Sequence, residues 1–519
     1  MTAEILTQKI NKHRTSSNDE VWIVVDLFCG AGGVTEGIEN ATHEGEKIAH
    51  VVACINHDPL AIQSHSNNHP DAVHFVEDVR KVNMRNLASL IAGAKAKYPN
   101  AKLALWASLE CTFFSKARNG PKNANSRSLA EVLYNYEEAL SPDFILIENV
   151  EDVKDWGPLN TAGKPIPELK GTLYRKWREN LKSRGYTYES RVLNCADYGA
   201  HTSRKRYFAI FAKQGLRITW PRPTHSKKGV GGLKPWKPVI EALDLEFKGV
   251  GIFDRKKPLV ENTLRRIYAG LEKFVNEKSI TNAFISKYYS GKPQDKNISI
   301  DGPSGTITPV DHHALVSLEM PWIVKYLSNN PKTGINKGVS VEEPCHTIAA
   351  QPRLALAQAE FLIQYYGNST VSSTDEPINT LTTKGRFGLV TTDIQWLHNP
   401  QYGCSTHSLD KPCFTLIARM DKAPPYLVST MIGSEAYHEI SPDDSPWTIK
   451  LKEYMNKFGI KNVYLRMLTI DERKLITGFP KSYRLAGTKA DQARFIGNAV
   501  PCIVPQRIFE SLWTGNVLM

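Results

Sequence analysis

The feature that most constrains the fold is an apolar run followed by a glycine-rich turn near the start of the chain. Residues 21–27 read VWIVVDL and residues 28–33 read FCGAGG. The apolar run from Val21 to Val25, which is rich in β-branched residues and is followed by Asp26, predicts a buried strand. The residues after the turn, VTEGIENA, predict a helix, so the stretch has the form of the opening of a βαβ unit.

The same alternation continues to about residue 213. The run IAHVVACIN predicts a second strand and DPLAIQSHSNNH a helix, while KLALWAS and FILIENV predict two more strands with helical segments between them. Strands that alternate with helices form parallel sheets with helices on both faces. The sequence therefore predicts an α/β fold with a doubly wound, mostly parallel sheet.

A different texture follows in residues 214–460, which contain four degenerate copies of one pattern. In each copy a serine stands four residues before a proline and a threonine three residues after it, and the prolines are Pro303, Pro344, Pro377 and Pro412. Spacings from the low thirties to the low forties are typical of stacked supersecondary units. Two interpretations stay open: an array of turns and short strands that is purely structural, or one that also contacts DNA on one face.

Charge and cysteine usage narrow the class of protein. The 519 residues carry 65 basic and 53 acidic side chains, a formal charge of +12 that suits a polyanionic partner such as nucleic acid. The eight cysteines show no C-x-x-C pair and no His/Cys cluster at zinc-ligand spacing, so we expect no disulfide framework and no metal site. Cys29 and Cys195 stand in turn or apolar contexts and are predicted to be structural. The polar first 20 residues and the lack of a long apolar stretch indicate neither secretion nor membrane insertion.

Five ordered blocks carry the chemistry. They are DLFCGAGG from residue 26, Cys111 in ASLECTFFS, ENV at 148–150, TSRKRYF at 202–208, and a C-terminal pair formed by RMLTIDERKLITGFP and FIGNAVP. In this order the blocks resemble the cytosine carbon-5 DNA methyltransferase family, and within it the phage and bacterial branch with an acidic residue before the catalytic cysteine. Enzymes of this kind include those of restriction-modification systems.

The resemblance covers roughly residues 21–213 and 463–505 and implies a division of the chain. A polar N-terminal extension at 1–20 precedes a Rossmann-like catalytic domain at 21–213. Residues 214–460 match the place of the family's target recognition region, and residues 461–519 are expected to complete the catalytic domain.

The family's cofactor is S-adenosylmethionine, and the resemblance implies which residues bind it. Asp78 of VEDVR matches the acid that binds the adenine amino group, and Asn498 of GNAVP completes the site from the far end of the chain. Asn56 of INHDP stands where most of the family has an acid for the ribose hydroxyls, and an amide still hydrogen-bonds a hydroxyl. The full predicted set comprises Asp26, Phe28, Gly30, Gly32, Gly33, Asn56, Asp78 and Asn498.

The predicted catalytic residues follow in the same way. The resemblance implies that the Cys111 thiolate adds to carbon 6 of cytosine, which makes carbon 5 nucleophilic. It implies that Glu148 hydrogen-bonds the ring nitrogen and the amino edge, and that Arg206 grips the base carbonyl with Arg204 beside it. Because carbon 6 is hidden in a stacked duplex, the target base is expected to be flipped into the pocket.

Two loops depart from the family's commoner form. Glu110 and Thr112 flank Cys111 where Pro-Cys-Gln is usual, and His201-Thr202 stands in place of Pro-Gln. Paired changes of this kind predict a remodelled pocket with methyl transfer intact.

Glu110 raises a question of its own, because a carboxylate that faced the thiol would raise the thiol's pKa and disfavour the reactive thiolate. Successive side chains at a strand end point to opposite faces. We therefore expect Glu110 to turn away from Cys111 and to pair with Lys116 or Arg118.

The leading hypothesis is a monomeric enzyme that methylates double-stranded DNA, with no metal, in the cytoplasm of a bacterial or phage-infected cell and associated with the nucleoid. A second hypothesis with the same chemistry is methylation of RNA or of an already modified pyrimidine, which the altered loops would permit. From another class, the chain would be a catalytically silent DNA-binding module. The intact nucleophile, acid and arginines argue against silence, and the long repeat-bearing insert favours duplex DNA.

Overall fold

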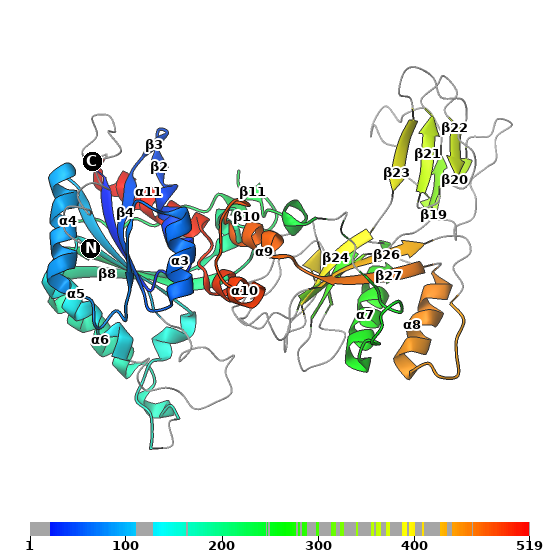
Figure 1. The fold of residues 1–519 in the computed structure, drawn as a ribbon, viewed down its shortest axis with the longest axis horizontal. Helices are drawn as coiled ribbons and strands as arrows, with labels where there is room; N and C mark the ends of the chain where they lie inside the picture. Colours follow the sequence, from blue (N-terminus) through cyan, green and yellow to red (C-terminus); the bar gives the residue numbers. More distant parts are fainter. Residues whose placement is uncertain are drawn as a thin grey trace.

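The computed structural model describes residues 21–109, 128–161, 164–244, 247, 250–276, 438–458 and 460–517, together with the strands between 279 and 432 named below. One sheet has seven strands in the order β5-β4-β1-β6-β7-β9-β8, and it lies on the left in Figure 1. The neighbouring strands from β5 to β7 pair in parallel. Strand β9 pairs antiparallel with β7 on one side and with β8 on the other. The strands are β1 (Trp22–Leu27), β4 (Ala49–Asn56), β5 (Val73–Val76), β6 (Lys102–Ser108), β7 (Phe144–Asn149), β8 (Tyr186–Asn194) and β9 (Lys205–Lys213).

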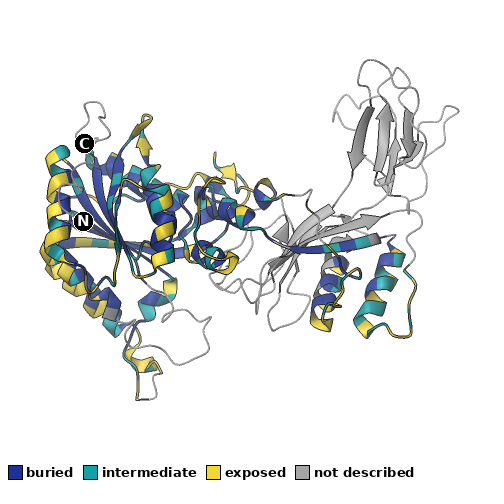
Figure 2. Cartoon of the chain, in the orientation of Figure 1, coloured by how far each residue is buried: buried dark blue, intermediate teal, exposed yellow. Residues whose placement is uncertain are grey.

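Helices cover both faces of this sheet, as the apolar strands predict. In β1, Ile23 and Val25 belong to the core on one face, whereas Trp22 and Val24 belong to the core on the other. Both sets are buried, which explains why the strand has no polar alternation (Figure 2). The first face packs against α4 (Met84–Lys97), α5 (Leu133–Leu140) and α6 (Thr172–Ser183), and the second against α2 (Gly33–Glu39), α3 (Pro59–Asn68) and α11 (Ile503–Val517). The predicted doubly wound α/β fold is confirmed.

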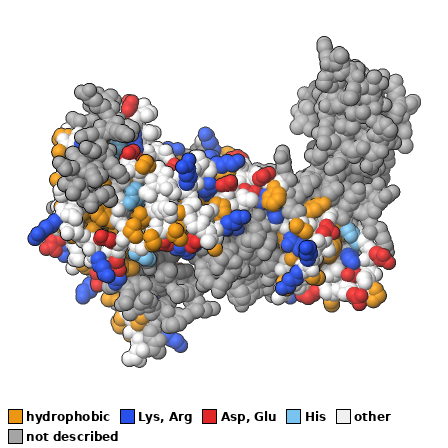
Figure 3. All heavy atoms as spheres, in the orientation of Figure 1, with side chains coloured by type: hydrophobic (Ala, Val, Ile, Leu, Met, Phe, Trp, Pro, Cys, Tyr) orange, Lys and Arg blue, Asp and Glu red, His pale blue; other side chains and the backbone are white. Residues whose placement is uncertain are grey.

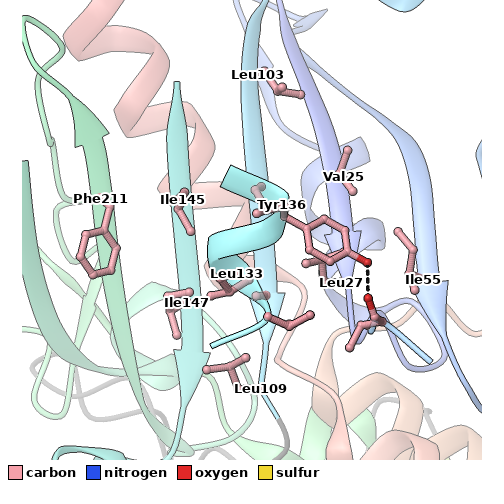
Figure 4. Packing of buried hydrophobic residues seen from close by; sticks show 14 of the residues in the cluster. Val25, Leu27, Ile55, Leu103, Leu109, Leu133, Tyr136, Ile145, Ile147 and Phe211 are labelled. Carbon is pink, nitrogen blue, oxygen red and sulfur yellow. Dashed lines mark hydrogen bonds between the residues drawn. The ribbon is translucent and has the colours of Figure 1, made fainter. Parts of the chain in front are cut away.

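Figure 4 shows the core on the first face. Tyr136 of α5 lies across the face of the sheet, and its hydroxyl donates a hydrogen bond of 2.8 Å to the carbonyl oxygen of Val79. Val79 lies in the connection after β5, so the bond attaches that connection to the helix layer. The buried phenol therefore contributes apolar area and a satisfied polar group at one position.

The last helix returns to the first strand. Phe509 of α11 packs edge-on against Trp22 of β1 with ring centroids 5.5 Å apart, and it also stacks near Trp106 of β6. The C-terminal helix thus covers sheet residues that precede it by more than 390 positions. Its burial of large aromatic rings supplies much of the core on this face.

Between β9 and α11 the chain builds a second, eight-stranded sheet. Its path is β12-β27-β26-β17-β15-β24-β25, with β16 paired to β15. Two helices lie beside it, α7 (Glu261–Phe274) and α8 (Pro446–Lys457), and they precede α9 (Ile470–Thr477) and α10 (Lys489–Asn498) in the return. Helices α9 and α10 both begin with a capping box, formed by Thr469 with Glu472 and by Thr488 with Asp491. The flanking strands are β12 (Val250–Gly251) and β27 (Ile460–Met467).

The four sequence repeats coincide with four similar strand units. In each unit a first strand pairs antiparallel with a short second strand, which ends on the serine of the repeat, and with a third strand that follows the repeat. The four prolines lie outside the described residues. The units are β15 (Ala283–Lys287), β16 (Asn297–Ser299) and β17 (His313–Ser317); β18 (Trp322–Lys325), β19 (Val339–Ser340) and β20 (Leu354–Ala357); β21 (Glu360–Gln364), β22 (Thr370–Ser373) and β23 (Phe387–Thr391); β24 (Ile394–Asn399), β25 (His407–Ser408) and β26 (Tyr426–Ile432).

Three two-stranded ribbons complete the described strands: β2 (Thr42–His43) with β3 (Glu46–Lys47), β10 (His225–Ser226) with β11 (Lys234–Pro235), and β13 (Val275–Asn276) with β14 (Ser279–Ile280). Among the residues that the structure describes, no helix combines the length and the apolar character needed to cross a bilayer.

Candidate active site

The topology of the sheet indicates where a ligand binds. From β1 the parallel strands proceed outward to β4 and β5, whereas from β6 they proceed in the opposite direction to β7. In open α/β sheets, ligands bind outside the carboxyl ends of the strands at the point where this order reverses. Here that point lies between the turn after β1, residues 28–33, and Leu109, the residue that follows β6.

The turn after β1 has an unusual backbone. Phe28 has φ of 59°, in the left-handed region that non-glycine residues rarely occupy, and Gly30 and Gly32 also have positive φ. At Gly32 an added Cβ would lie 2.3 Å from the Tyr483 hydroxyl, and at Gly33 it would lie 2.9 Å from the Val500 carbonyl oxygen. These two glycines therefore allow the C-terminal segment to approach the turn, a packing role that exists beside any contact with a ligand.

Asp26 lies directly before this turn and is fully buried. Its Oδ2 accepts a hydrogen bond of 2.9 Å from the Thr35 hydroxyl, while its Oδ1 has no hydrogen-bond partner among the described residues. Burial raises the pKa of Asp26 to about 7, and the Thr35 hydrogen bond acts in the opposite direction. A buried, half-satisfied carboxyl group beside a strained turn marks this position as a binding site candidate.

Asn56 is the last residue of β4, and Asp78 follows β5 at the same edge of the sheet. The side-chain oxygen of Asn56 accepts from the Asp58 backbone N–H at 2.9 Å, which fixes the amide at the end of β4. Asp78 accepts two bonds of 2.9 Å from Arg80, and this interaction lowers the pKa of Asp78 to about 2. Asn498 is exposed at the end of α10.

Glu148 and two arginines form a buried charged cluster at the end of β7. The carboxylate of Glu148 lies 3.3 Å from Nε of Arg206, and all three side chains are buried. Burial raises the pKa of Glu148, whereas the charges of Arg206 and Arg204 act in the opposite direction. Arg204 also donates from Nη1 to the Gly497 carbonyl at 3.0 Å, which links the cluster to the residue before Asn498. The predicted carboxylate and both predicted arginines are therefore close together.

Cys111, Glu110 and Thr112 lie outside the described residues, as do Lys116 and Arg118. The described segment 21–109 ends two residues before Cys111. The Asn149 side chain, which is buried, donates to the Leu109 carbonyl oxygen at 3.1 Å. The residue next to Glu148 thus fixes the point where the segment with Cys111 begins, a contact that the ENV motif alone did not reveal.

Two other groups were missed by the sequence analysis. Tyr483 donates to the Ala31 carbonyl oxygen at 2.7 Å and lies 3.2 Å from Nε2 of His69. Cys54, His65 and His74 come together behind the glycine-rich turn, although they are 11 and 9 positions apart in sequence and match no common ligand spacing. Cys29 and Cys195, predicted to be structural, are both buried, and burial raises the pKa of each thiol.

The chain is similar to known proteins. A family model described as C-5 cytosine-specific DNA methylase matches residues 23–514. The Type II methylase M.HgiDII of Herpetosiphon aurantiacus is 27% identical over 231 residues, which are 44% of this chain and 56% of that protein. The Type II methyltransferase M.BspRI of Lysinibacillus sphaericus is 26% identical over 281 residues, 46% of this chain and 59% of that one.

The chain therefore spans little more than half the length of these relatives. A solved DNMT2 of Spodoptera frugiperda covers 95% of this chain and 99% of its own, at 14% identity and a TM-score of 0.44. Since the family model extends over most of the sequence, the chain belongs to the C-5 cytosine-specific DNA methylases.

Proposed function

We propose that this protein methylates carbon 5 of cytosine in double-stranded DNA, with S-adenosylmethionine as the methyl donor and Cys111 as the nucleophile. The observation that carries the proposal is the buried cluster of Glu148, Arg206 and Arg204 in a chain of this family. Glu148 lies on β7 and Arg206 on β9, and Arg204 directly precedes β9. By the resemblance, each matches a residue of the family's catalytic site.

The residues at the sheet's switch point fit the proposed cofactor. When bound, S-adenosylmethionine supplies an electrophilic methyl group. The unsatisfied Oδ1 of Asp26 is available to a cationic amino group, and the turn at Phe28, Gly30, Gly32 and Gly33 places backbone N–H groups at the carboxyl end of β1. Asn56 and Asp78, at the ends of the two next strands, would bind the ribose hydroxyls and the adenine amino group, and Asn498 would close the site.

The chain's own groups then have distinct roles. The Cys111 thiolate would add to carbon 6 of the base, and Glu148 would hydrogen-bond the ring nitrogen as charge develops there. The raised pKa of Glu148 favours the protonated carboxyl group, which is the form that donates such a bond. Arg206 would hold the base carbonyl and Arg204 would keep the loop beside the C-terminal segment.

DNA is favoured as the substrate by the family and by the excess of basic charge. On the face seen in Figure 3, Lys and Arg side chains are interspersed with acidic ones over the described elements. By the resemblance to the family, we assign target recognition to residues 214–460 as a part of the proposal, with residues 21–213 and 461–519 forming the catalytic domain. The enzyme would act as a monomer, without a metal in the catalytic step, in the nucleoid of a bacterial or phage-infected cell.

The test uses the full chain with tritium-labelled S-adenosylmethionine and separate pools of duplex DNA and RNA. Label in DNA is expected, label in RNA alone would replace DNA by the alternative substrate, and no label in either pool would leave a silent DNA-binding module. Cys111→Ser should abolish incorporation with cofactor affinity unchanged. A duplex with 5-fluorocytosine at the target should give the wild-type protein an adduct that resists denaturation, since fluorine does not leave as a proton does.

A further inference from the structure

A cluster of three metal-binding side chains lies directly behind the glycine-rich turn, outside the proposed catalytic groups. Cys54 comes from β4, His65 from α3 and His74 from β5. One ligand atom from each residue lies within 4.8 Å of the other two. Cys54 and His65 are fully buried and His74 is partly exposed, so the cluster is enclosed by protein with one side toward the surface.

Hydrogen bonds hold His65 in the orientation that a metal ligand needs. Thr35 donates its hydroxyl proton to Asp26 Oδ2 at 2.9 Å, so its oxygen accepts from Nε2–H of His65 at 3.0 Å. This assigns the proton of the imidazole to Nε2 and leaves the Nδ1 lone pair facing Nε2 of His74, 2.9 Å away. Metal-bound histidines are commonly oriented by such a bond from the second ring nitrogen toward a carboxylate or hydroxyl.

The ligand types indicate which ion would bind. A thiolate with two imidazoles is a donor set for Zn²⁺, which takes sulfur and nitrogen ligands in tetrahedral geometry. At ordinary Zn–N lengths two ligand nitrogens lie about 3.4 Å apart. The two histidine nitrogens would therefore need to separate by about 0.5 Å, and both rings would need to tilt so that their lone pairs converge on the ion.

We propose that Cys54, His65 and His74 bind one Zn²⁺ ion, with Thr35 and Asp26 orienting His65. On binding, the Cys54 thiol gives its proton to solvent. The proton that His74 carries on Nε2, between the two histidine nitrogens, leaves to solvent, and the ring stays neutral by taking up a proton on Nδ1. A fourth position is left to a ligand from solvent. The ring of His65 lies 3.1 Å from the place where Gly32 would carry a Cβ, so the ion would join α3, β4 and β5 behind the turn and make the turn more rigid.

The experiment measures zinc in the full-length protein. Protein purified without chelator, dialysed and analysed by mass spectrometry should contain one zinc per chain, and competition with a chromogenic chelator gives the affinity. Cys54→Ser and His74→Gln should lose the stoichiometric zinc. Matched controls are Cys195→Ser, another buried free thiol, and His57→Gln, an exposed histidine of the same segment, and both should retain it.

Two further measurements keep the proposal testable if a variant fails to fold. Thr35→Val removes no ligand, and it should weaken zinc binding by about 10–100-fold through loss of the bond to His65. In wild-type protein, Co²⁺ in place of zinc should produce a thiolate-to-cobalt absorption band. Absence of that band, or zinc content no higher than in His74→Gln, would overturn the site and leave a hydrogen-bonded network without metal.

Discussion

Glu148 differs from the other carboxylates at the strand ends because it is buried together with its cationic partner. Glu148→Gln keeps the size of the side chain and removes both the charge and the acid. We expect the rate of methyl transfer to fall by about 10²–10⁴-fold, the usual contribution of a positioned acid or base, with unchanged affinity for the cofactor. The measurement is single-turnover methylation of duplex DNA beside equilibrium binding of the cofactor.

Glu151→Gln is the matched control for this prediction, since Glu151 follows on the next turn and is exposed. Its rate should equal that of the wild-type protein. A Glu148→Gln variant within threefold of that rate would show that the carboxylate does not take part in the reaction.

Asp26 makes a distinct prediction about pH. Its pKa is about 7 in the folded chain, whereas an unfolded aspartate titrates at ~3.9. Between these values the folded state binds the proton more strongly, so the free energy of unfolding falls as pH rises from about 4 to about 7 and then levels off. Asn cannot ionise, so the variant Asp26→Asn lacks this pH dependence. The difference in the free energy of unfolding, variant minus wild type, should therefore be up to about 4 kcal/mol larger at pH 8 than at pH 4.

Urea unfolding at these two pH values, in the presence of a chelator, measures the difference. Asp443→Asn, at an exposed position, serves as the control and should follow the pH dependence of the wild-type protein. If the stability of Asp26→Asn changed with pH as that of the wild-type protein does, folding would not raise the pKa of the Asp26 carboxyl group.

Several helices and strands of residues 21–213 follow from local sequence. The segments VWIVVDL and KLALWAS became β1 and β6 almost to the residue, because strands buried on both faces are mostly apolar, with Asp26 as the buried exception in β1. Helix α3 begins where Asp58 caps it and Pro59 occupies the first position, both visible in the sequence. The blocks that resemble the family also contain Glu148, Arg204 and Arg206, which the fold brings close together.

Other features depend on contacts between distant segments. The place of β9 between β7 and β8 is set by long-range pairing, and nothing in residues 205–213 predicts it. The bond from Asn149 to Leu109 needs the register of two strands, and the meeting of Cys54, His65 and His74 needs three elements at once. No spacing rule for ligands along one chain segment describes such a cluster.

Two helical glycines give opposite predictions. A Cβ added at Gly37 of α2 would lie 2.0 Å from the Cys502 carbonyl oxygen, where the backbone leading into α11 crosses. Gly37→Ala should therefore destabilise the protein by at least about 1–3 kcal/mol. At Gly93 of α4 an added Cβ meets nothing within 4 Å, and Gly93→Ala should stabilise it by about 0.5–1 kcal/mol. Thermal unfolding of both variants tests the close approach of α2 to the C-terminal segment, and a neutral Gly37→Ala would contradict it.

The strand units built by the repeats differ in how they join the rest of the protein. Units one and four share the eight-stranded sheet, whereas units two and three form separate three-stranded sheets. Strands β17 and β24, which flank those two units in sequence, pair antiparallel, so the end of β17 approaches the start of β24. Replacing residues 319–392 by a short Gly-Ser linker should leave cofactor binding unchanged and alter the choice of methylated sites.

Calorimetry with the cofactor and sequencing of methylated cytosines measure the two outcomes separately. Loss of cofactor binding in the deletion variant would show that the two units support the catalytic half. In the intact protein, DNA affinity should fall steeply as salt increases, because phosphate contacts release counterions.

The packing of α11 on β1 has a consequence for the synthesis of this protein. Roughly 290 residues separate the end of β9 from Ile503, where α11 begins. A ribosome that adds about 5–20 residues per second needs about 15–60 s to make them. During that time the sheet face with Trp22 and Trp106 lacks its last covering helix and exposes apolar surface. We therefore expect the speed of translation to affect the yield of folded protein, because this face stays uncovered until the final helix emerges.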